Sequence, residues 1–239
     1  MLNIIIPMAG LSSRFTKAGY TLPKYMLYAG GKSLFAHSVE SFHKYFSTAR
    51  FVFIARELYD TRRFVSEECE RLCVSHYDIV MLDEPTRGQA ETVKIGIEYA
   101  GIGDDEPLLV FNIDTFRPGF ALPSVALESD GYLEVFRGEG PNWSYAKTES
   151  NTSTRVVETA EKKEISHYCS TGLYYFSHAS DYHAAYERYM VQDRELYVAP
   201  MYNILIADGR DIRIFEIKSE DVIFCGTPQE YDAYIKKII

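Results

Sequence analysis

Short apolar runs alternate with amphipathic stretches along the first half of the chain. An apolar run of about four to eight residues is typical of a buried strand, and apolar residues three and four positions apart are typical of a helix. Repeated strand–helix units of this length predict a mostly parallel sheet covered by helices on both faces. The expected strands are Leu2–Met8, Phe51–Ala55, Ile79–Leu82 and Leu108–Asn112, and the expected helices are Leu34–Tyr45, Asp60–Cys73 and Ala90–Ala100.

The second half of the chain alternates apolar and polar residues with turn residues between the runs, which is typical of antiparallel strands. We therefore predict one mixed α/β domain over residues 1–239, in two halves that meet near residue 120, with its site at the carboxyl ends of the parallel strands. The expected strands are Gly131–Phe136, Ser144–Thr148, Arg155–Thr159, Ser170–Phe176 and Ile212–Ile217, and the expected helices are Ala179–Val191, Ala199–Asp208 and one from Pro228.

Composition excludes some partners. The chain has 239 residues, of which 46% are hydrophobic and 25% charged, as in an ordinary globular domain with a core of normal size. Its net charge of −9 argues against a nucleic-acid or anionic-membrane partner, so a local cluster of cations would have to hold an anionic substrate. No apolar run approaches the ~20 residues that cross a bilayer, and the N-terminal run lacks the basic start of a signal peptide. With four cysteines and no secretion signal, we expect reduced thiols and a cytoplasmic location; a homo-oligomer is left open.

A turn of small residues, Ala9 to Arg14, directly follows the first expected strand. Gly10 allows a sharp bend and a close approach of backbone N–H groups to a ligand. The planar fork of Arg14 suits phosphate oxygens, and Pro23 stiffens the backbone in front of a second cation, Lys24. These features predict a triphosphate-binding loop built from Ala9, Gly10, Ser12, Ser13, Arg14 and Lys24.

The stretch from Leu2 to Lys24 resembles the N-terminal signature of the sugar-phosphate nucleotidyltransferase superfamily, (A/G)-G-x-(G/S)-(S/T)-R-(F/L)…P-K. The resemblance implies a GT-A-type, Rossmann-like α/β fold that joins a nucleoside triphosphate to a phosphate monoester and releases pyrophosphate. Residues of about 1–120 would then bind the nucleotide, and residues of about 121–239 the acceptor. Arg14 and Lys24 would be the catalytic cations.

An acidic residue, Asp114, follows the apolar strand that ends at Asn112. A carboxylate just beyond a buried parallel strand points into the crevice where ligands bind, and a hard oxygen ligand suits Mg²⁺. Family members carry a metal-binding Asp at the end of this strand, so the resemblance implies the same role for Asp114. We therefore expect Mg²⁺ as the cofactor.

The loop before the third expected helix contains Gly88 and Gln89. The glycine allows a close approach, and the amide of the glutamine has both a donor and an acceptor for the edge of a nucleobase. The family has a similar G-(T/Q)-A stretch that contacts the base, so both residues are expected to bind the nucleotide.

Three residues of the second half are expected at the acceptor. Glu161-Lys162-Lys163, followed by the strand that contains Gly172, resembles the family's E-K…G-x-Y-x-F segment. In that segment the lysine, here Lys162 with Lys163 as the alternative, holds the acceptor's phosphate, and the glycine strand passes under the acceptor. Trp143 lies where family members line the acceptor pocket.

The C-terminal part of the chain departs from the family pattern. Many relatives have a D-x-G-T or D-T-P segment whose aspartate supplies a second metal ligand. Here Phe224 or Gly226 stands at that position, and Asp221 has the wrong offset. Either Asp114 and the phosphates hold the metal alone, or another acid takes the place of the missing one.

The segment Gly30-Gly31-Lys32-Ser33 ends like a P-loop, but GxxxxGK[ST] requires a glycine where Met26 stands. We predict a β-turn here, with Ser33 starting a helix.

The expected reaction is one in-line displacement at the α-phosphorus of a nucleoside triphosphate by a phosphate dianion, which needs no general base. The preferred acceptor is a sugar 1-phosphate, and the product would be a nucleotide sugar for the synthesis of surface (capsule) polysaccharide. The alternative is a cytidylyltransferase that acts on a small phospho-amine such as phosphocholine. A GT-A glycosyltransferase, which usually has a D-x-D motif that is missing around Asp114, and a non-catalytic nucleotide-binding relative remain further alternatives.

Overall fold

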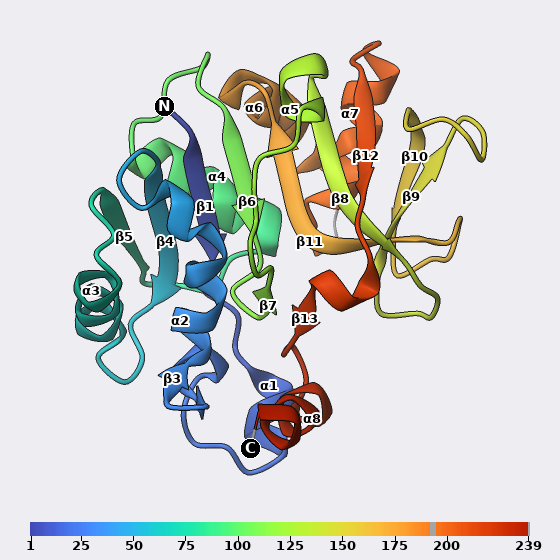
Figure 1. Cartoon of the computed structure of the whole chain (residues 1–239). Coiled ribbons are helices and arrows are strands. Elements are labelled where there is room, and N and C mark those ends of the chain that lie inside the picture. The colour runs from blue at the N-terminus through green and yellow to red at the C-terminus, as the bar shows by residue number, and fades with distance from the viewer. Residues whose placement is uncertain (192–194, 239) are drawn as a thin grey trace.

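The computed structural model describes residues 1–191 and 195–238. Within these residues, nine strands form one main sheet, which runs through the centre of the molecule (Figure 1). Its strands are β1 (Asn3–Pro7), β4 (Arg50–Arg56), β5 (Tyr77–Leu82), β6 (Leu108–Phe111), β8 (Gly131–Arg137), β9 (Ser144–Thr148), β10 (Val156–Glu161), β11 (Tyr168–Phe176) and β12 (Ile212–Glu216).

The two halves of the chain build the two halves of this sheet. Strands β5, β4, β1 and β6 are neighbours in that order and are all parallel. Strand β11 joins β6 in the antiparallel sense and continues the sheet, pairing with both β8 and β9. Strand β12 is parallel to β8, and β10 is antiparallel to β9. The predicted mixed sheet, with a parallel first half, is confirmed, and the second half is antiparallel except for the pairing of β12 with β8.

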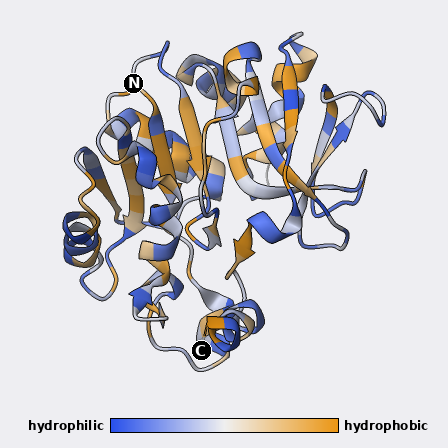
Figure 2. Cartoon of the chain, viewed as in Figure 1, coloured by the Kyte–Doolittle hydropathy of each residue, from blue (hydrophilic) through white to orange (hydrophobic). Residues whose placement is uncertain are grey.

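Side chains alternate between the two faces of the sheet, as the pleat of a strand requires. On one face, Ile5 packs with α4 (Gln89–Tyr99), α6 (Ala179–Tyr189) and α7 (Tyr202–Ala207). On the other face, Ile4 and Ile6 pack with α2 (Leu34–Val39), η2 (Glu40–Tyr45), α3 (Thr61–Leu72) and α5 (Val125–Glu128). The strands of the parallel half are mostly apolar, whereas α3 is mostly polar (Figure 2).

A third apolar cluster lies below the carboxyl ends of the parallel strands. Its members come from α1 (Ser13–Lys17), the two-residue strands β2 (Tyr28–Ala29) and β7 (Thr115–Phe116), α2, and the C-terminal helix α8 (Pro228–Ile238). Strand β7 pairs with β13 (Ile223–Phe224), which leads into α8. The C-terminal segment is thereby fixed beside the N-terminal loop, more than 200 residues away in the sequence (Figure 1).

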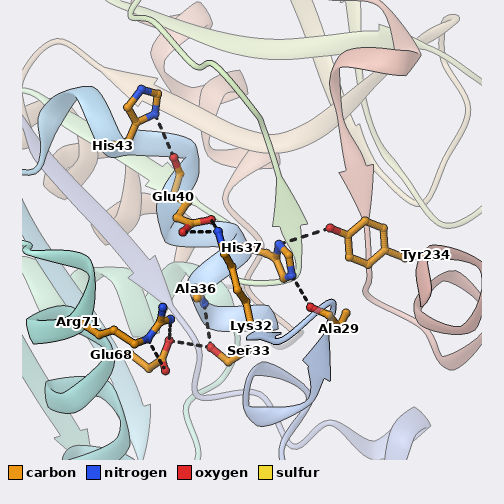
Figure 3. Close-up of polar contacts among 10 residues, drawn as sticks. All are labelled: Ala29, Lys32, Ser33, Ala36, His37, Glu40, His43, Glu68, Arg71 and Tyr234. Carbon is orange, nitrogen blue, oxygen red and sulfur yellow. Dashed lines mark hydrogen bonds and ion pairs between the residues drawn. The ribbon is translucent and has the colours of Figure 1, made fainter. Parts of the chain in front are cut away.

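The segment that ends like a P-loop is a hairpin, as predicted. Strand β2 and strand β3 (Lys32–Ser33) pair around Gly30 and Gly31, and Ser33 caps α2 by accepting a hydrogen bond from the Ala36 N–H at 3.0 Å. The Ser33 hydroxyl also donates to the buried carboxylate of Glu68, 2.8 Å away, and Arg71 pairs with the same carboxylate (Figure 3). These contacts fix the start of α2, so Ser33 has a structural role.

Helix α8 is also tied to α2 by a histidine. The Nε2 of His37 donates to the carbonyl of Ala29 at 2.8 Å, and its Nδ1 lies 3.3 Å from the hydroxyl of Tyr234 (Figure 3). The imidazole also packs against the rings of Phe116 and Tyr234. The segment that carries β13 and α8 is therefore held firmly against the parallel half.

Some predicted element bounds are wrong. The single helix expected at 34–45 divides, because Phe42 has non-helical angles (φ −103°, ψ 23°) and the second part, η2, is a 3₁₀ helix. The helix expected from Ala199 likewise begins as the 3₁₀ turn η3 (Ala199–Met201), with Pro200 inside it. The remaining short elements, η1 (Lys24–Met26) and η4 (Ser219–Asp221) among them, have too few residues to show periodicity in a sequence.

Candidate active site

A cavity of about 750 Å³ opens at the carboxyl ends of β1, β5 and β6 and extends over β11 toward the antiparallel strands. Both halves of the chain line it, as predicted for a site at this edge of the sheet. The structure brings every residue selected from the sequence to this one cavity: Ala9, Gly10, Ser12, Ser13, Arg14, Lys24, Gly88, Gln89, Asp114, Trp143, Lys162 and Gly172.

The sharp bend in the N-terminal loop is at Ser12, which corrects the prediction that Gly10 provides it. Ser12 has a left-handed backbone (φ 50°) and precedes α1, whereas Gly10 has no such angle. The ideal Cβ position at Gly10 has no heavy atom within 4 Å, so the loop has an open side there. The Ser12 hydroxyl accepts a hydrogen bond from the backbone N–H of Lys24 at 3.3 Å, which joins the two parts of the N-terminal motif.

Aromatic residues anchor this loop to the C-terminal helix. The rings of Phe15, Tyr20 and Tyr231 pack edge to face, with centroids 5.4–6.2 Å apart. The hydroxyl of Tyr20 donates to Asp232 at 3.0 Å. Edge-to-face pairs add to the stability gained by burying the rings. The predicted phosphate-binding loop is therefore built on a rigid support instead of a free surface turn.

The predicted catalytic lysine and the predicted metal-binding aspartate form an ion pair. The Nζ of Lys24 lies 2.5 Å from Oδ2 of Asp114, and both side chains are about one-fifth exposed. The backbone carbonyl of Asp114 accepts a hydrogen bond from the N–H of Cys225 at 2.8 Å, which ties this point to the C-terminal segment. Both charges therefore lie at the centre of the cavity, between the N-terminal loop and the antiparallel strands.

Gly226, one of the two positions considered for a second metal-binding aspartate, lies next to Asp114. An ideal Cβ on Gly226 would lie 2.9 Å from Oδ2 of Asp114 and 3.6 Å from Oε2 of Glu230. The two carboxylates thus approach the same point, and burial together with both negative charges raises the pKa of the neighbouring Cys225 thiol to about 12. Glu230 lines the cavity and also caps α8 by accepting from the Thr227 N–H at 2.8 Å.

These oxygens suit Mg²⁺, which takes one or two protein carboxylates and completes its octahedron with water and substrate phosphates. Within residues 1–191 and 195–238, no three His, Cys, Asp or Glu side chains gather closely enough to hold a metal by themselves. Asp114, with Glu230 beside it, therefore fits a metal that shares its coordination with a bound triphosphate.

An asparagine that the sequence analysis did not select lies at the junction of the two halves. The Nε2 of Gln89 donates to Oδ1 of Asn112, so the predicted base-reading amide is held by this side chain. Gly172 has a left-handed backbone (φ 87°), and a Cβ there would lie 2.3 Å from Nδ2 of Asn112. The glycine is required at this irregularity in the pairing of β11 with β8 because only hydrogen leaves room for the amide.

Gly88 is required for a close contact inside the protein. Its φ of 143° favours glycine, and a Cβ would lie 2.4 Å from the carbonyl oxygen of Leu196. Backbone hydrogen bonds join Leu196 N to Arg87 O at 2.9 Å and Ala90 N to Leu196 O at 3.0 Å. The loop that carries Gln89 is therefore paired with the segment at Leu196.

Trp143 and Lys162 lie at the open end of the β9–β10 hairpin. The N–H of Lys162 donates to the carbonyl of Trp143 at 2.9 Å, and Lys162 has a left-handed backbone (φ 55°). The indole packs on the rings of Phe136 and Phe224, with centroids 5.1 and 4.8 Å away. Trp143 therefore belongs to a small apolar cluster and lines the cavity at the same time.

Glu161, the neighbour of Lys162, also lines the cavity. It belongs to the Glu-Lys-Lys motif but was not predicted to be a site residue. Its carboxylate accepts from the Ser144 hydroxyl, which in turn accepts from Tyr174 at 3.3 Å. Burial raises the pKa of Glu161, with the hydrogen bond from Ser144 and the charge of Lys162 acting against the rise. Its position directly before the predicted phosphate-binding lysine was the available signal.

The described lining of the cavity has mixed charge. Among the residues that the structure describes there, Arg14, Lys24 and Lys162 are basic, and Asp114, Glu161, Glu195 and Glu230 are acidic. A triphosphate and a second phosphate together carry more negative charge than three cations neutralise. The described side chains thus call for a bound cation if both anions enter together.

One solved structure is similar to this protein over nearly the whole chain. The nucleoside-diphosphate-sugar pyrophosphorylase of Vibrio cholerae RC9 is 50% identical, with a TM-score of 0.94 over 98% of this chain and 99% of that one. Two other structures share the fold. The inositol-1-phosphate CTP transferase of T. maritima is 16% identical, with a TM-score of 0.74 over 99% of this chain and 95% of that one. The UDP-glucose pyrophosphorylase of Acinetobacter baumannii is 13% identical, with a TM-score of 0.74 over 98% of this chain and 92% of that one. No protein-family model and no curated protein matches the chain.

The Rossmann-like fold and the cavity at its switch point define a nucleotidyltransferase. The chain belongs to the nucleoside-diphosphate-sugar pyrophosphorylases, within the sugar-phosphate nucleotidyltransferase superfamily. None of the described helices is long and apolar enough to span a membrane.

Proposed function

We propose that this protein joins a nucleoside triphosphate to a sugar 1-phosphate, with Mg²⁺, and releases pyrophosphate. The observation that carries the proposal is the cavity itself. It contains the loop from Ala9 to Arg14 at one end, Lys162 and Trp143 at the other, and the Lys24–Asp114 pair between them. The 50% identical relative from Vibrio cholerae is named as an enzyme of this class.

The reaction needs alignment and charge neutralisation more than acid–base chemistry, because the attacking group is already a phosphate dianion. Arg14 and the N–H groups of the loop bind the triphosphate, and Gln89 reads the base. Lys162 binds the acceptor phosphate and directs one of its oxygens toward the α-phosphorus. Lys24 stabilises the charge that develops on the α-phosphate and the leaving pyrophosphate.

Asp114 holds the metal in this proposal, and Glu230 lies near enough to assist it. When bound, Mg²⁺ supplies positive charge for the phosphate oxygens. The mixed charge of the described cavity lining supports this role, since three basic side chains face four acidic ones there.

A second class of acceptor, the phospho-amines, is supported by a separate observation. The acceptor end contains the carboxylates of Glu161 and Glu195 and the rings of Trp143 and Phe224. Carboxylates and aromatic faces also bind ammonium groups, so a phospho-amine such as phosphocholine, taken by a cytidylyltransferase, is the alternative acceptor. The same carboxylates suit sugar hydroxyls, and the named relative favours the sugar.

The test is pyrophosphate release with Mg²⁺, each of UTP, CTP, dTTP, GTP and ATP, and a panel of sugar 1-phosphates and phosphocholine. Release that requires both a nucleotide and a sugar 1-phosphate supports the proposal. Release only with phosphocholine supports the alternative, and nucleotide binding without release with any pair contradicts both. The roles in surface polysaccharide supply and the cytoplasmic location stay predictions.

A further inference from the structure

We propose that Tyr197 is a positioning residue that holds the ammonium group of Lys162, and that the backbone pairing of its neighbour Leu196 with Arg87 and Ala90 joins the base-reading loop to the acceptor site. The inference rests on the proposed function, because it takes Lys162 to bind the acceptor phosphate. Tyr197 matches no motif in the sequence.

The first observation is the contact between the two side chains. The Nζ of Lys162 donates to the hydroxyl of Tyr197 at 2.5 Å and lies 4.5 Å from the centre of its ring. The Tyr197 hydroxyl in turn donates to the carboxylate of Glu195. A lysine side chain has four rotatable bonds, and its half-exposed ammonium would otherwise sample many positions.

The second observation is the way in which Tyr197 is itself held. Its neighbours Leu196 and Val198 are fully buried in the main core, whereas Tyr197 lines the cavity. The segment therefore presents Leu196 and Val198 to the core and Tyr197 to the cavity. Tyr197 is therefore carried by an anchored backbone, and its ring is a fixed support.

The third observation is the link to the nucleotide side. The N–H of Leu196 donates to the carbonyl of Arg87, and the carbonyl of Leu196 accepts from the N–H of Ala90. Gly88, between these two residues, approaches Leu196 too closely for any residue with a side chain. The next residue of this loop, Gln89, begins α4, lines the cavity and is the residue proposed to read the base. A nucleotide that orders the Gly88–Gln89 loop would therefore also order the segment that carries Tyr197.

The geometry accounts for how one cavity aligns two anions that come from opposite ends. The segment at Leu196 pairs with the base-reading loop, and the adjacent ring places the lysine that brings in the second phosphate. Alignment of this kind lowers the entropic cost of the reaction. Tyr197 does this through Lys162, without contact with the reacting atoms.

Two variants of the full-length protein test the inference. Tyr197→Phe removes the hydroxyl and keeps the ring, whereas Tyr197→Leu removes both. With the pair of substrates found in the release panel, the KM of the sugar 1-phosphate is expected to rise a few-fold in the first and about tenfold in the second. The KM of the nucleotide is expected to stay within about twofold when the sugar 1-phosphate is saturating. Tyr99→Phe and Tyr99→Leu are matched controls on an exposed tyrosine outside the cavity.

A chemical readout separates the inference from the proposed function. Acetylation of lysines by an N-hydroxysuccinimide ester, followed by mass spectrometry, compares Lys162 with the adjacent exposed Lys163 in the same peptide. Wild-type Lys162 is expected to react more slowly than Lys163, and Tyr197→Leu is expected to bring the two rates together. Equal rates in the wild type, or a ratio unchanged by both variants, overturns the inference. Absence of pyrophosphate release from the wild type with every pair overturns the proposed function instead, and the labelling ratio still decides whether Tyr197 holds Lys162.

Discussion

The ammonium of Lys24 and the carboxylate of Asp114 lie 2.5 Å apart, although 90 residues separate them in the chain. Lys24 follows the N-terminal loop, and Asp114 follows the central strand β6. The pair places one cation beside the oxygen proposed to bind the metal, at the point where the α-phosphate must lie if the triphosphate and the acceptor enter from opposite ends.

Replacement of Lys24 separates its catalytic role from its structural one. Lys24→Ala is expected to reduce turnover by about 10²–10³-fold, because it removes a positive charge aimed at the developing charge. The free energy of unfolding is expected to fall by no more than about 1 kcal/mol, because the ion pair is partly exposed. Pyrophosphate release and urea denaturation measure the two effects. Lys17→Ala, at the exposed end of α1, is the control, and equal turnover of the Lys24 variant and this control would contradict the assignment.

Glu230 has two contacts that two substitutions can separate. Glu230→Gln keeps an acceptor for the Thr227 N–H but removes the charge near Asp114, whereas Glu230→Ala removes both. If the carboxylate assists the metal, both variants are expected to weaken Mn²⁺ binding in the presence of nucleotide, and only the alanine variant is expected to lose about 1 kcal/mol of stability with the cap. Electron paramagnetic resonance measures the free Mn²⁺. Wild-type affinity in Glu230→Gln would limit this residue to capping α8.

A buried ion pair supports the floor of the acceptor site. Arg117 lies 3.1 Å from both carboxylate oxygens of Glu134, which is 1% exposed, and Thr171 of the cavity wall donates to the same carboxylate. Arg117→Met is expected to cost about 3 kcal/mol, since it leaves a buried carboxylate without its cation. Arg117→Met with Glu134→Leu is expected to recover most of this loss, and urea denaturation of both proteins measures it.

The loss in Arg117→Met is expected to depend on pH. Burial raises the pKa of Glu134 and Arg117 opposes the rise, so removal of Arg117 raises this pKa further. A carboxyl group whose pKa is raised by folding favours the folded state at low pH, and that advantage is lost as the pH rises through the folded-state pKa. The variant is therefore expected to be closer to wild type at pH 5 than at pH 8. An equal loss at both values would show that removal of Arg117 does not raise the pKa of Glu134.

Most of the fold was predictable because its strands are long apolar runs with helices between them. The segments that complete the site are different. Strands β7 and β13 have two residues each, and their pairing depends on contacts between parts of the chain about 100 residues apart, which no local pattern encodes. The left-handed bend at Ser12 could not be distinguished from one at Gly10, because glycine is the residue that usually takes such angles.

Most of the predicted site residues share one cavity because they belong to motifs that follow a strand or close a hairpin; Lys24 in η1 and Gly172 inside β11 are the exceptions. Asn112, Tyr197 and Glu230 were missed for a common reason: each lies beside a predicted site residue that is remote in the sequence, namely Gln89, Lys162 and Asp114. The sequence left two positions, Phe224 and Gly226, as the equivalent of the family's second metal-binding aspartate. The structure places Gly226 beside Asp114 and thus selects it over Phe224.

Glu161 offers a test of how function and stability are balanced in the acceptor site. Its pKa is raised by burial, so its contribution to stability is largest below the ordinary pKa of a glutamate and is lost as the pH rises. Glu161→Gln is expected to be more stable than wild type at pH 8, equal to it near pH 4, and weaker in binding the acceptor. Thermal unfolding at the two pH values, with the KM of the sugar 1-phosphate, checks the prediction. A variant less stable at pH 8 would show that the ionised carboxylate stabilises the fold.

The central claim is that a phosphate oxygen of the acceptor attacks the α-phosphorus of the nucleotide. The most direct measurement uses the sugar 1-phosphate identified in the panel, labelled with ¹⁸O in its non-bridging phosphate oxygens, and mass spectrometry of the products. The account predicts that the nucleoside-diphosphate sugar retains all of the label and that the pyrophosphate contains none. Label in the pyrophosphate, or an unlabelled nucleoside-diphosphate sugar, would contradict it.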